Sequence, residues 1–350
     1  MGKRIVVMGA GGIAGNLAGH LALAGEDITI VDAWPAHVDA IVAAGLRLGG
    51  CVGVEQLAHP RALHVGEAWQ LRDVDVLILG VKAYDNEWCA ALLKPCLKRD
   101  ATVLSAQNGV QEERLAEIFG AERVVGAVVL FAGALDGPGC VRLETPGREQ
   151  PATAPAERGR LLIGELHGRT TPRLLALQAL LEHAVAVPIS DNIWGELWSK
   201  LVMNCMSNPI NAVLGGASAD ARLEPGPRAV SLRVGAEAAA LGQKLGYEIP
   251  PIAGIAADAL VAAGGGQGVD AVARQWAATG QALKGIVGSM PRDMRRGHKT
   301  EADSFCGYIV RKAFEVGLPV PANESVDRLV RAIEAGELRP GPENLGLLVG

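Results

Sequence analysis

The chain has 350 residues and a formal net charge of −5, and 49% of its residues are hydrophobic while 4% are aromatic. This length allows two domains with a substantial core, the composition excludes a disordered chain, and the lack of a basic block argues against a nucleic-acid partner. Because the sequence shows no signal-peptide pattern, no apolar run of about 20 residues and no metal-ligand spacing among its six cysteines, we expect a soluble cytoplasmic protein with reduced thiols, no membrane partner and no metal.

The first residues predict a strand, a glycine-rich turn and a helix. The apolar run of residues 5–8 leads into "GAGGIAG", after which apolar residues recur at helical spacing. Gly9, Gly11 and Ala14 form the pattern G-x-G-x-x-A, which permits a tight turn, a close approach of the backbone to a pyrophosphate, and close packing of the helix on the strand. We therefore predict that this turn and the start of the helix bind a dinucleotide through Gly9, Ala10, Gly11, Gly12, Ile13 and Ala14.

A second predicted strand, "DITIVDAW", ends in Asp32, about twenty residues after the turn, as a dinucleotide-binding fingerprint requires. A carboxylate at this position accepts hydrogen bonds from ribose hydroxyls and repels a 2′-phosphate, and no Arg or Lys follows closely. Asp32 therefore favours NAD(H) over NADP(H). The alternative is an ordinary surface aspartate in a turn.

Three further apolar runs predict strands that are buried on both faces: "DVDVLILGVKAYD", "ATVLSAQNGV" and "ERVVGAVVLF". Lys82 and Asn108 stand at the carboxyl ends of the first two, where open parallel sheets bind ligands. Lys82 could contact a cofactor phosphate, a ribose or a substrate anion, and Asn108 could contact the nicotinamide or its ribose. The alternatives are a lysine that extends to solvent and an Asn-Gly turn.

Beyond these strands, a Pro- and Gly-rich stretch over residues 145–160 predicts a hairpin-like excursion, Thr171 predicts a helix N-cap, and "VAVPIS" predicts a last strand. From Asp191 onward the apolar patterns are helical, over residues 191–206, 225–246, 252–262, 269–288 and 301–316. We therefore predict an α/β protein: an N-terminal Rossmann-type doubly wound sheet over residues 1–189, an all-α domain over residues 190–338, and a C-terminal tail over residues 339–350.

The first predicted helix of the second domain carries an unusual polar stripe. Lys200, Asn204 and Asn208 are spaced at i, i+4 and i+8, so on one continuous helix they share a face. Since two-domain dinucleotide enzymes usually hold their substrate between the domains, we expect this stripe to face the nicotinamide. The alternative is a surface stripe on which Lys200 pairs with Glu196.

Several motifs occur in the order in which the ketopantoate reductases (2-dehydropantoate 2-reductases) have them, among them "GAGGIAG", "VKAYD", "QNGV", "LWSKLVMNCMSNPINAV" and "GSMPRDMRRGHKTEADSF". The chain resembles that family from about residue 3 to residue 325. The resemblance implies that Lys200 is the catalytic general acid and Glu301 the carboxylate opposite it. It places Asn204, Asn208 and Ser289 at substrate-binding positions, and Asn108 and Lys82 at cofactor-contacting and active-site positions.

The sequence departs from the family pattern at four places. Many members have a basic residue after the second strand and use NADPH, whereas this chain has Asp32. Asp85 replaces a residue that is often Gln in the family, and Ile286 replaces an Asn that some members have. The stretch of residues 145–160 is longer than is usual in the family. We expect reduction of a 2-oxo acid, first 2-dehydropantoate to (R)-pantoate, with NAD(H) favoured and NADP(H) open. The alternatives are an NAD-dependent D-2-hydroxyacid dehydrogenase and a non-catalytic dinucleotide-sensing module. A homodimer is compatible with each.

Overall fold

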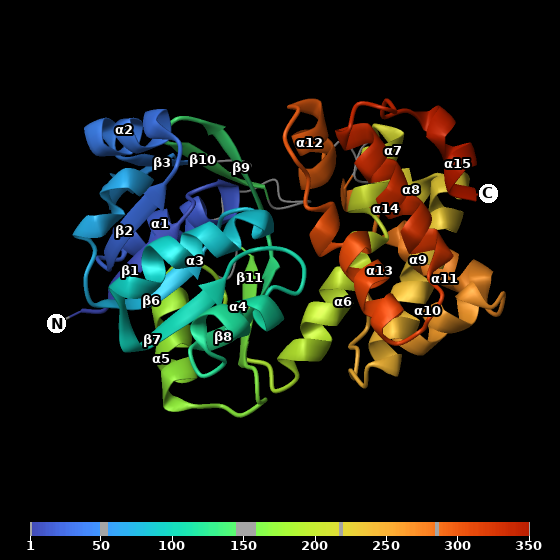
Figure 1. Ribbon diagram of the computed structural model, residues 1–350, viewed down its shortest axis with the longest axis horizontal. Coiled ribbons are helices and arrows are strands. Elements are labelled where there is room, and N and C mark those ends of the chain that lie inside the picture. The colour runs from blue at the N-terminus through green and yellow to red at the C-terminus, as the bar shows by residue number, and fades with distance from the viewer. Residues whose placement is uncertain (1, 50–54, 145–158, 217–219, 284–286, 350) are drawn as a thin grey trace. The chain divides into compact units, whose positions relative to one another are not determined.

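The computed structural model describes residues 2–49, 55–144, 159–216, 220–283 and 287–349 (Figure 1). They belong to two compact units, Met1–Ile193 and Trp194–Gly350. The first unit combines sheets and helices, and the second is helical. The predicted fold class, a doubly wound α/β sheet followed by helices, is therefore confirmed.

The main sheet of the first unit has seven strands in the order β11-β8-β7-β6-β1-β2-β5. All neighbours pair in parallel except β11, which is antiparallel to β8. The order reverses direction beside β1, which is the topological switch point where open α/β sheets bind their ligands. The strands are β1 (Arg4–Met8), β2 (Asp27–Asp32), β5 (Arg61–His64), β6 (Val74–Leu79), β7 (Leu97–Ser105), β8 (Val124–Leu130) and β11 (Arg160–Glu165).

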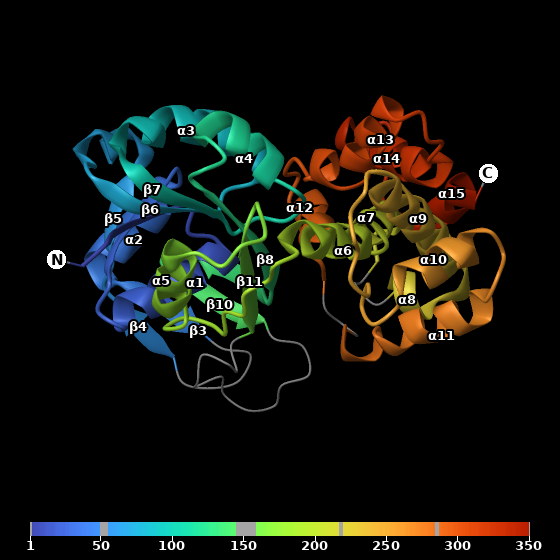
Figure 2. The ribbon, with the colours of Figure 1, turned by 90° about the horizontal axis from the view of Figure 1, so that it is seen from below.

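Helices cover both faces of this sheet because both faces are apolar. In β1, Ile5 and Val7 belong to one buried cluster, while Val6 and Met8 belong to another. Figure 2 shows α1 and α5 on one face, and α3 and α4 on the other. The helices are α1 (Gly12–Leu23), α2 (Pro35–Ala44), α3 (Asn86–Leu93), α4 (Glu112–Phe119) and α5 (Pro172–Leu181), with short 3-10 turns η1 (Val65–Gln70), η2 (Ala83–Asp85) and η3 (Lys94–Cys96).

A second, four-stranded sheet was not predicted. Its order is β4-β3-β10-β9, built from β3 (Leu46–Gly49), β4 (Gln56–Ala58), β9 (Ala132–Gly137) and β10 (Cys140–Glu144). It packs on α1 where glycines replace side chains: a Cβ on Gly12 would lie 2.3 Å from the Gly133 carbonyl, and a Cβ on Gly15 would lie 2.8 Å from Val141. These two glycines therefore make room for the sheet.

The two extended pieces predicted to flank the excursion are present as β10 and β11, but the predicted hairpin-like arrangement and the predicted last strand were wrong. β10 and β11, which flank the predicted excursion, pair with β9 and β8 in different sheets and not with each other. Residues 145–158 themselves lie outside the described residues. The predicted strand "VAVPIS" forms only isolated bridges, through Ala186 and Ile189, because Pro188 lacks the N–H that a ladder requires.

The start of α5 agrees with the sequence prediction. The Thr171 hydroxyl accepts the Leu174 N–H at 3.2 Å, and Pro172 occupies the first helical position. The neighbouring Arg173 donates through Nε to the buried carboxylate of Glu165 at 2.8 Å. This ion pair ties α5 to the end of β11.

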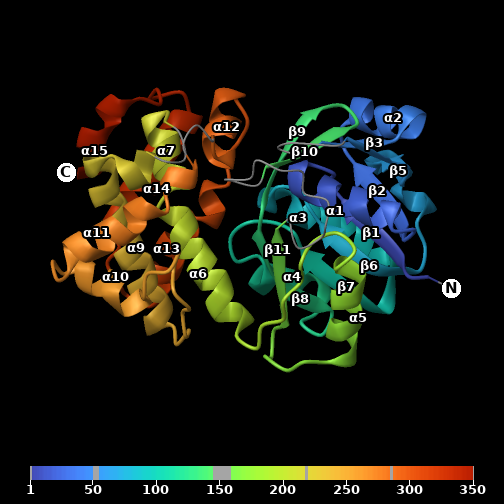
Figure 3. The same cartoon turned by 180° about the vertical axis from the view of Figure 1, so that it is seen from behind.

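The second unit contains no named strand among its described residues. Its central helix α9 contacts α7, α8, α10, α11, α13, α14 and α15 (Figure 3). Small residues allow this close packing, since a Cβ on Gly242 would lie 2.8 Å from the Trp198 ring. The helices are α6 (Ile193–Cys205), α7 (Asn208–Leu214), α8 (Asp220–Leu223), α9 (Pro225–Lys244), α10 (Ala257–Gly264), α11 (Val269–Ala278), α12 (Ser289–Arg295), α13 (Cys306–Glu315), α14 (Pro321–Glu334) and α15 (Leu345–Val349), with 3-10 turns η5 (Gln281–Leu283), η6 (Ala302–Ser304) and η7 (Pro342–Asn344).

Two features of this unit differ from the sequence predictions. The helix that carries Lys200 ends at Cys205, and Asn208 begins a separate helix, because Pro209 lacks the N–H needed to continue α6 and favours a first helical turn. The predicted tail over residues 339–350 contains η7 and α15, and Leu348 is buried. None of the helices that the structure describes combines the length and hydropathy of a membrane span.

Candidate active site

The glycine turn has the backbone geometry that a bound pyrophosphate requires. Gly9 has φ of +84°, and a Cβ there would lie 2.8 Å from the Val81 nitrogen. The Ala14 side chain packs against Gly80, where a Cβ would lie 2.2 Å from the Ala14 Cβ. A Cβ on Gly11, the N-cap of α1, would meet nothing within 4 Å. The turn is therefore closed where the helix meets the sheet and open at Gly11, where a phosphate would bind.

Asp32 is fixed to this turn by hydrogen bonds to both carboxylate oxygens. The Ala10 N–H donates to Oδ2 at 2.8 Å, and the Trp34 N–H donates to Oδ1 at 2.8 Å. Each oxygen can accept a second hydrogen bond, so the carboxylate can also bind ribose hydroxyls. These residues therefore fit an adenine dinucleotide.

Lys82 and Asn108 follow neighbouring strands at the carboxyl edge of the main sheet. Lys82 comes after β6 as the N-cap of η2, and Asn108 comes after β7, just before Gly109 with φ of +83°. Both side chains are half-buried. The structure thus brings Asp32, Lys82 and Asn108 to the same edge of the sheet as the glycine turn.

A buried amide network that sequence reasoning missed supports this edge. Gln107 donates through Nε2 to the Val81 carbonyl at 2.7 Å and to Asn86 Oδ1 at 2.8 Å. Gln111 Nε2 donates to the Asn108 carbonyl at 3.0 Å. These bonds fix the segments that carry Lys82 and Asn108. The side chains come from the loop after β7, from α3 and from the loop before α4, so only tertiary structure reveals the network.

Lys200 and Asn204 lie one turn apart on α6, as predicted. Burial and, to a smaller extent, the positive charge of Arg222 together lower the pKa of the half-buried Lys200 ammonium to about 8. Asn204 is 5% exposed, and its Nδ2 has no hydrogen-bond partner among the residues that the structure describes. Since buried amide donors are normally paired, this face of α6 combines a titratable cation with a donor available to a ligand.

Arg222 of α8 is a buried cation that sequence reasoning missed. It is 5% exposed, its guanidinium lies 4.2 Å from the centre of the Trp276 ring, and its Nε donates to Thr279 Oγ1 at 3.0 Å. Burial lowers the pKa of Arg222 to about 10. No local pattern in the sequence distinguishes this arginine from one on the surface.

Asn208 and Ser289 each occupy the first position of a short helix. Asn208 begins α7 and Ser289 begins α12, these two helices contact each other, and both side chains are half-buried. Ile286, at which the sequence departs from the family pattern, lies outside the described residues. The predicted stripe of three polar residues on one helix is therefore reduced to two, with Asn208 on the next helix.

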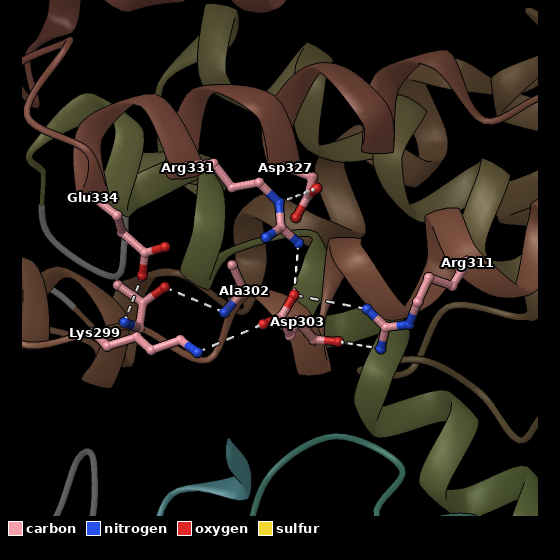
Figure 4. Close-up of polar contacts among 8 residues, drawn as sticks. Lys299, Ala302, Asp303, Arg311, Asp327, Arg331 and Glu334 are labelled. Atoms are coloured by element: carbon pink, nitrogen blue, oxygen red, sulfur yellow. Dashed lines mark hydrogen bonds and ion pairs between the residues drawn. The ribbon is translucent and has the colours of Figure 1, made fainter.

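Glu301 is 6% exposed and directly precedes η6. Its two neighbours are fixed by hydrogen bonds: the Thr300 N–H donates to Glu334 Oε1 at 2.6 Å, and the Ala302 N–H donates to Thr300 Oγ1 at 3.2 Å (Figure 4). The backbone on both sides of Glu301 is therefore held in place.

Asp303 connects the same segment to two further helices. Arg331 of α14 donates through Nη2 to Asp303 Oδ1 at 2.6 Å and through Nε to Asp327 Oδ2 at 2.8 Å, and Arg311 of α13 donates to the Asp303 carbonyl at 2.8 Å (Figure 4). Burial alone would raise the pKa of Asp303, but the hydrogen bond from Arg331 and the positive charges of Arg331, Arg311 and Lys299 together outweigh it and lower the pKa. The carboxylate stays charged, and the network orders residues 299–303.

Among the residues that the structure describes, no group of three or more His, Cys, Asp or Glu side chains could hold a metal ion. The candidate residues form two sets, each within one unit. One lies at the carboxyl edge of the main sheet of the first unit, and the other lies on α6, α7, α8, α12 and η6 of the second.

Known proteins match both units. The family model "Ketopantoate reductase PanE/ApbA" matches residues 5–150, and its C-terminal counterpart matches residues 192–334. A 2-dehydropantoate 2-reductase of Mesorhizobium japonicum is 30% identical, over 95% of this chain and 99% of the relative. The crystal structure of a PanE/ApbA family ketopantoate reductase from Ralstonia eutropha JMP134 has a TM-score of 0.78 at 30% identity, covering 95% of this chain and 99% of that one. D-mandelate dehydrogenase, solved with NADH and anilino(oxo)acetate, has the same fold, with a TM-score of 0.78 at 22% identity over 95% of this chain and 99% of that one.

Proposed function

Because the chain belongs to the ketopantoate reductase family and is thus an NAD(P)-dependent oxidoreductase, we propose that it reduces a 2-oxo acid, with 2-dehydropantoate as the first candidate and (R)-pantoate as its product. The observation that carries this proposal is the presence, one turn apart on α6, of Lys200, whose pKa is about 8, and of Asn204, whose buried Nδ2 has no hydrogen-bond partner among the described residues. Such a pair suits a substrate that carries a carbonyl beside a carboxylate.

Lys200 is the general acid in this proposal. A reduced nicotinamide, when bound, supplies the hydride that the carbonyl carbon gains. The carbonyl oxygen then needs a proton, and an ammonium with a pKa near 8 is mostly protonated at pH 7 yet donates far more readily than an ordinary lysine. The same positive charge stabilises the negative charge that develops on the oxygen.

The remaining polar residues bind and orient the substrate. Asn204 Nδ2 donates to the substrate carboxylate or carbonyl, and Asn208 and Ser289 donate from the first turns of α7 and α12. Glu301 accepts from a substrate hydroxyl or holds the Lys200 ammonium. Asn108 acts at the nicotinamide end of the cofactor or on the substrate.

We further propose that the cofactor is NAD(H). Both oxygens of Asp32 are directed by backbone N–H groups of the turn region, so the carboxylate is held where the adenosine ribose hydroxyls would bind. A 2′-phosphate there would face a fixed negative charge. Lys82 supplies a positive charge at the same edge for a phosphate or ribose of the cofactor.

The test is a panel of 2-oxo acids, each followed by NADH and by NADPH absorbance. We expect the highest kcat/KM with 2-dehydropantoate and NADH. Lys200→Met should lose turnover by about 100-fold or more while binding NADH normally, because general-acid and electrostatic roles of this kind contribute about 10²–10⁴. Lys244→Ala, at the exposed end of α9, is the matched control and should leave turnover unchanged.

Each other outcome has a defined meaning. Faster turnover of D-2-hydroxy acids such as mandelate with NAD would favour an NAD-dependent D-2-hydroxyacid dehydrogenase. NADH binding without turnover of any substrate would favour a sensing module. Full activity of Lys200→Met would exclude the proposed mechanism.

A further inference from the structure

Trp34 is an exposed aromatic side chain at the carboxyl end of β2. It is 41% exposed, whereas Trp198 and Trp276 are fully buried. It stands two residues after Asp32 and is the N-cap of α2. Exposure alone is not unusual for a single aromatic residue, but this ring lies directly beside the predicted ribose site.

The indole is rigidly supported on one face. The ring of Trp34 stacks on that of His37, with the centroids 5.8 Å apart and an interplanar angle of 11°. His37 is fully buried, and both of its ring nitrogens are engaged: the Gly139 N–H donates to Nδ1 at 2.9 Å, and Nε2 lies 3.2 Å from the Ala10 carbonyl, to which it donates. The indole is thus nearly parallel to a fixed ring, while Trp34 stays 41% exposed.

The same contacts join this ring pair to the glycine turn. Ala10 bonds to Asp32 through its N–H and to His37 through its carbonyl, while the Trp34 N–H bonds to Asp32. The turn, the carboxylate and the indole therefore form one hydrogen-bonded unit. In an adenine dinucleotide the base is attached to the ribose whose hydroxyls Asp32 would bind, so the base lies one sugar away from that carboxylate.

We propose that the exposed face of Trp34 is the stacking platform for the adenine ring of the cofactor. An aromatic ring fits this role because every base has a π-face, and stacking needs no charged group beside Asp32. A purely structural role, in which Trp34 only covers His37 at the start of α2, would stabilise the fold without distinguishing one ligand from another. This inference rests on the proposed dinucleotide cofactor.

Binding of half-cofactors separates the two roles. ADP-ribose carries the adenine, whereas reduced nicotinamide mononucleotide lacks it, and isothermal titration gives Kd for each without any turnover. We expect Trp34→Leu to raise Kd for ADP-ribose by about 5- to 150-fold, the range for losing one base–aromatic stack, and to leave Kd for the mononucleotide unchanged. Trp34→Phe should restore most of the affinity.

Trp69 provides the matched control. It is 69% exposed and lies on η1 of the same unit, so Trp69→Leu removes an even more exposed indole and should change neither Kd. Unchanged ADP-ribose affinity in Trp34→Leu, or an equal loss for both ligands, would overturn the inference. Should Trp34→Leu not fold, NMR cross-relaxation between the adenine protons and the Trp34 indole in the native protein decides: its presence supports the stack and its absence refutes it.

The proposed function can fail separately. If ADP-ribose binding depends on Trp34 but no 2-oxo acid is reduced, the stacking role of Trp34 is supported and the proposed substrate is refuted. If the native protein binds no ADP-ribose, both fall.

Discussion

The pKa of Lys200 leads to a quantitative pH dependence for reduction. Below pH 8 the ammonium carries the proton that the substrate oxygen needs, and above it the protonated fraction falls about tenfold per pH unit. At pH 9 about a tenth of the enzyme is active in reduction, and at pH 10 about a hundredth. A lysine at the ordinary value of 10.5 would keep about three-quarters of its activity at pH 10.

The charge of a neighbouring side chain, Arg222, contributes to the lowered pKa of Lys200. Burial is the larger cause of the lowered pKa of Lys200, and the charge of Arg222 is the smaller. Arg222→Gln removes that charge and keeps much of the side-chain volume, so the pKa of Lys200 should rise. The alkaline limb, which is the part of the pH–activity profile where activity falls with rising pH, should then move to higher pH by about one unit or less. Arg222→Lys retains a positive charge and should move the limb less.

The assay is kcat/KM for the best 2-oxo acid at saturating NADH, measured from about pH 6 to about pH 11, since this parameter reports the groups that titrate before the substrate binds. Melting temperatures of the Arg222 variants identify any loss of folding. A flat profile up to pH 10 in the native enzyme would refute the assignment of the limb to Lys200. An identical limb in Arg222→Gln would refute the electrostatic role of Arg222.

Three further predictions concern stability and packing. Burial raises the pKa of the Glu112 carboxyl to about 7, so this group stabilises the fold below about pH 4.5 and loses that effect as the pH rises to about 7. Glu112→Gln should therefore raise the free energy of unfolding in urea by up to about 3 kcal/mol at pH 8 and by less at pH 5. An equal gain at both pH values would contradict this reasoning. Arg173→Leu leaves the buried Glu165 carboxylate unpaired and should cost about 3–5 kcal/mol in the same assay, most of which an added Glu165→Gln should recover. Gly12→Ala places a Cβ 2.3 Å from a backbone carbonyl of β9, so it should lower both the melting temperature and the affinity for NADH. An unchanged melting temperature would show that β9 can shift to make room.

The parts of the fold that the sequence predicted depend on neighbouring residues. The turn at Gly9 and Gly11 follows from which residues tolerate positive φ or a close approach, and the N-cap at Thr171 follows from one side chain and the backbone three residues on. The parallel strands are long apolar runs whose position in a doubly wound sheet is typical. Local chemistry was sufficient in each of these cases.

The second sheet and the supporting networks could not be predicted in the same way. β3 has four residues and pairs with β10, which lies more than ninety residues further along the chain, so its register follows from tertiary packing and not from a strand pattern. Gln107 and Arg222 are single polar residues whose partners come from other helices and loops. The continuous polar stripe was a local error, since Pro209 already indicated that α6 stops before Asn208.

The charged groups of the two units differ in what they contribute. Glu165 is buried, but Arg173 and Thr171 bond to its carboxylate, and those bonds outweigh the effect of burial and lower its pKa, as expected for a pair that holds α5 to β11. Lys200 and Arg222 have the opposite character, because burial is the largest cause that lowers the pKa of each. In the proposed function, an anionic substrate would favour the charged form of Lys200. We therefore propose that the fold retains Lys200 for a ligand, whereas Glu165 and Arg173 hold two elements of the fold together.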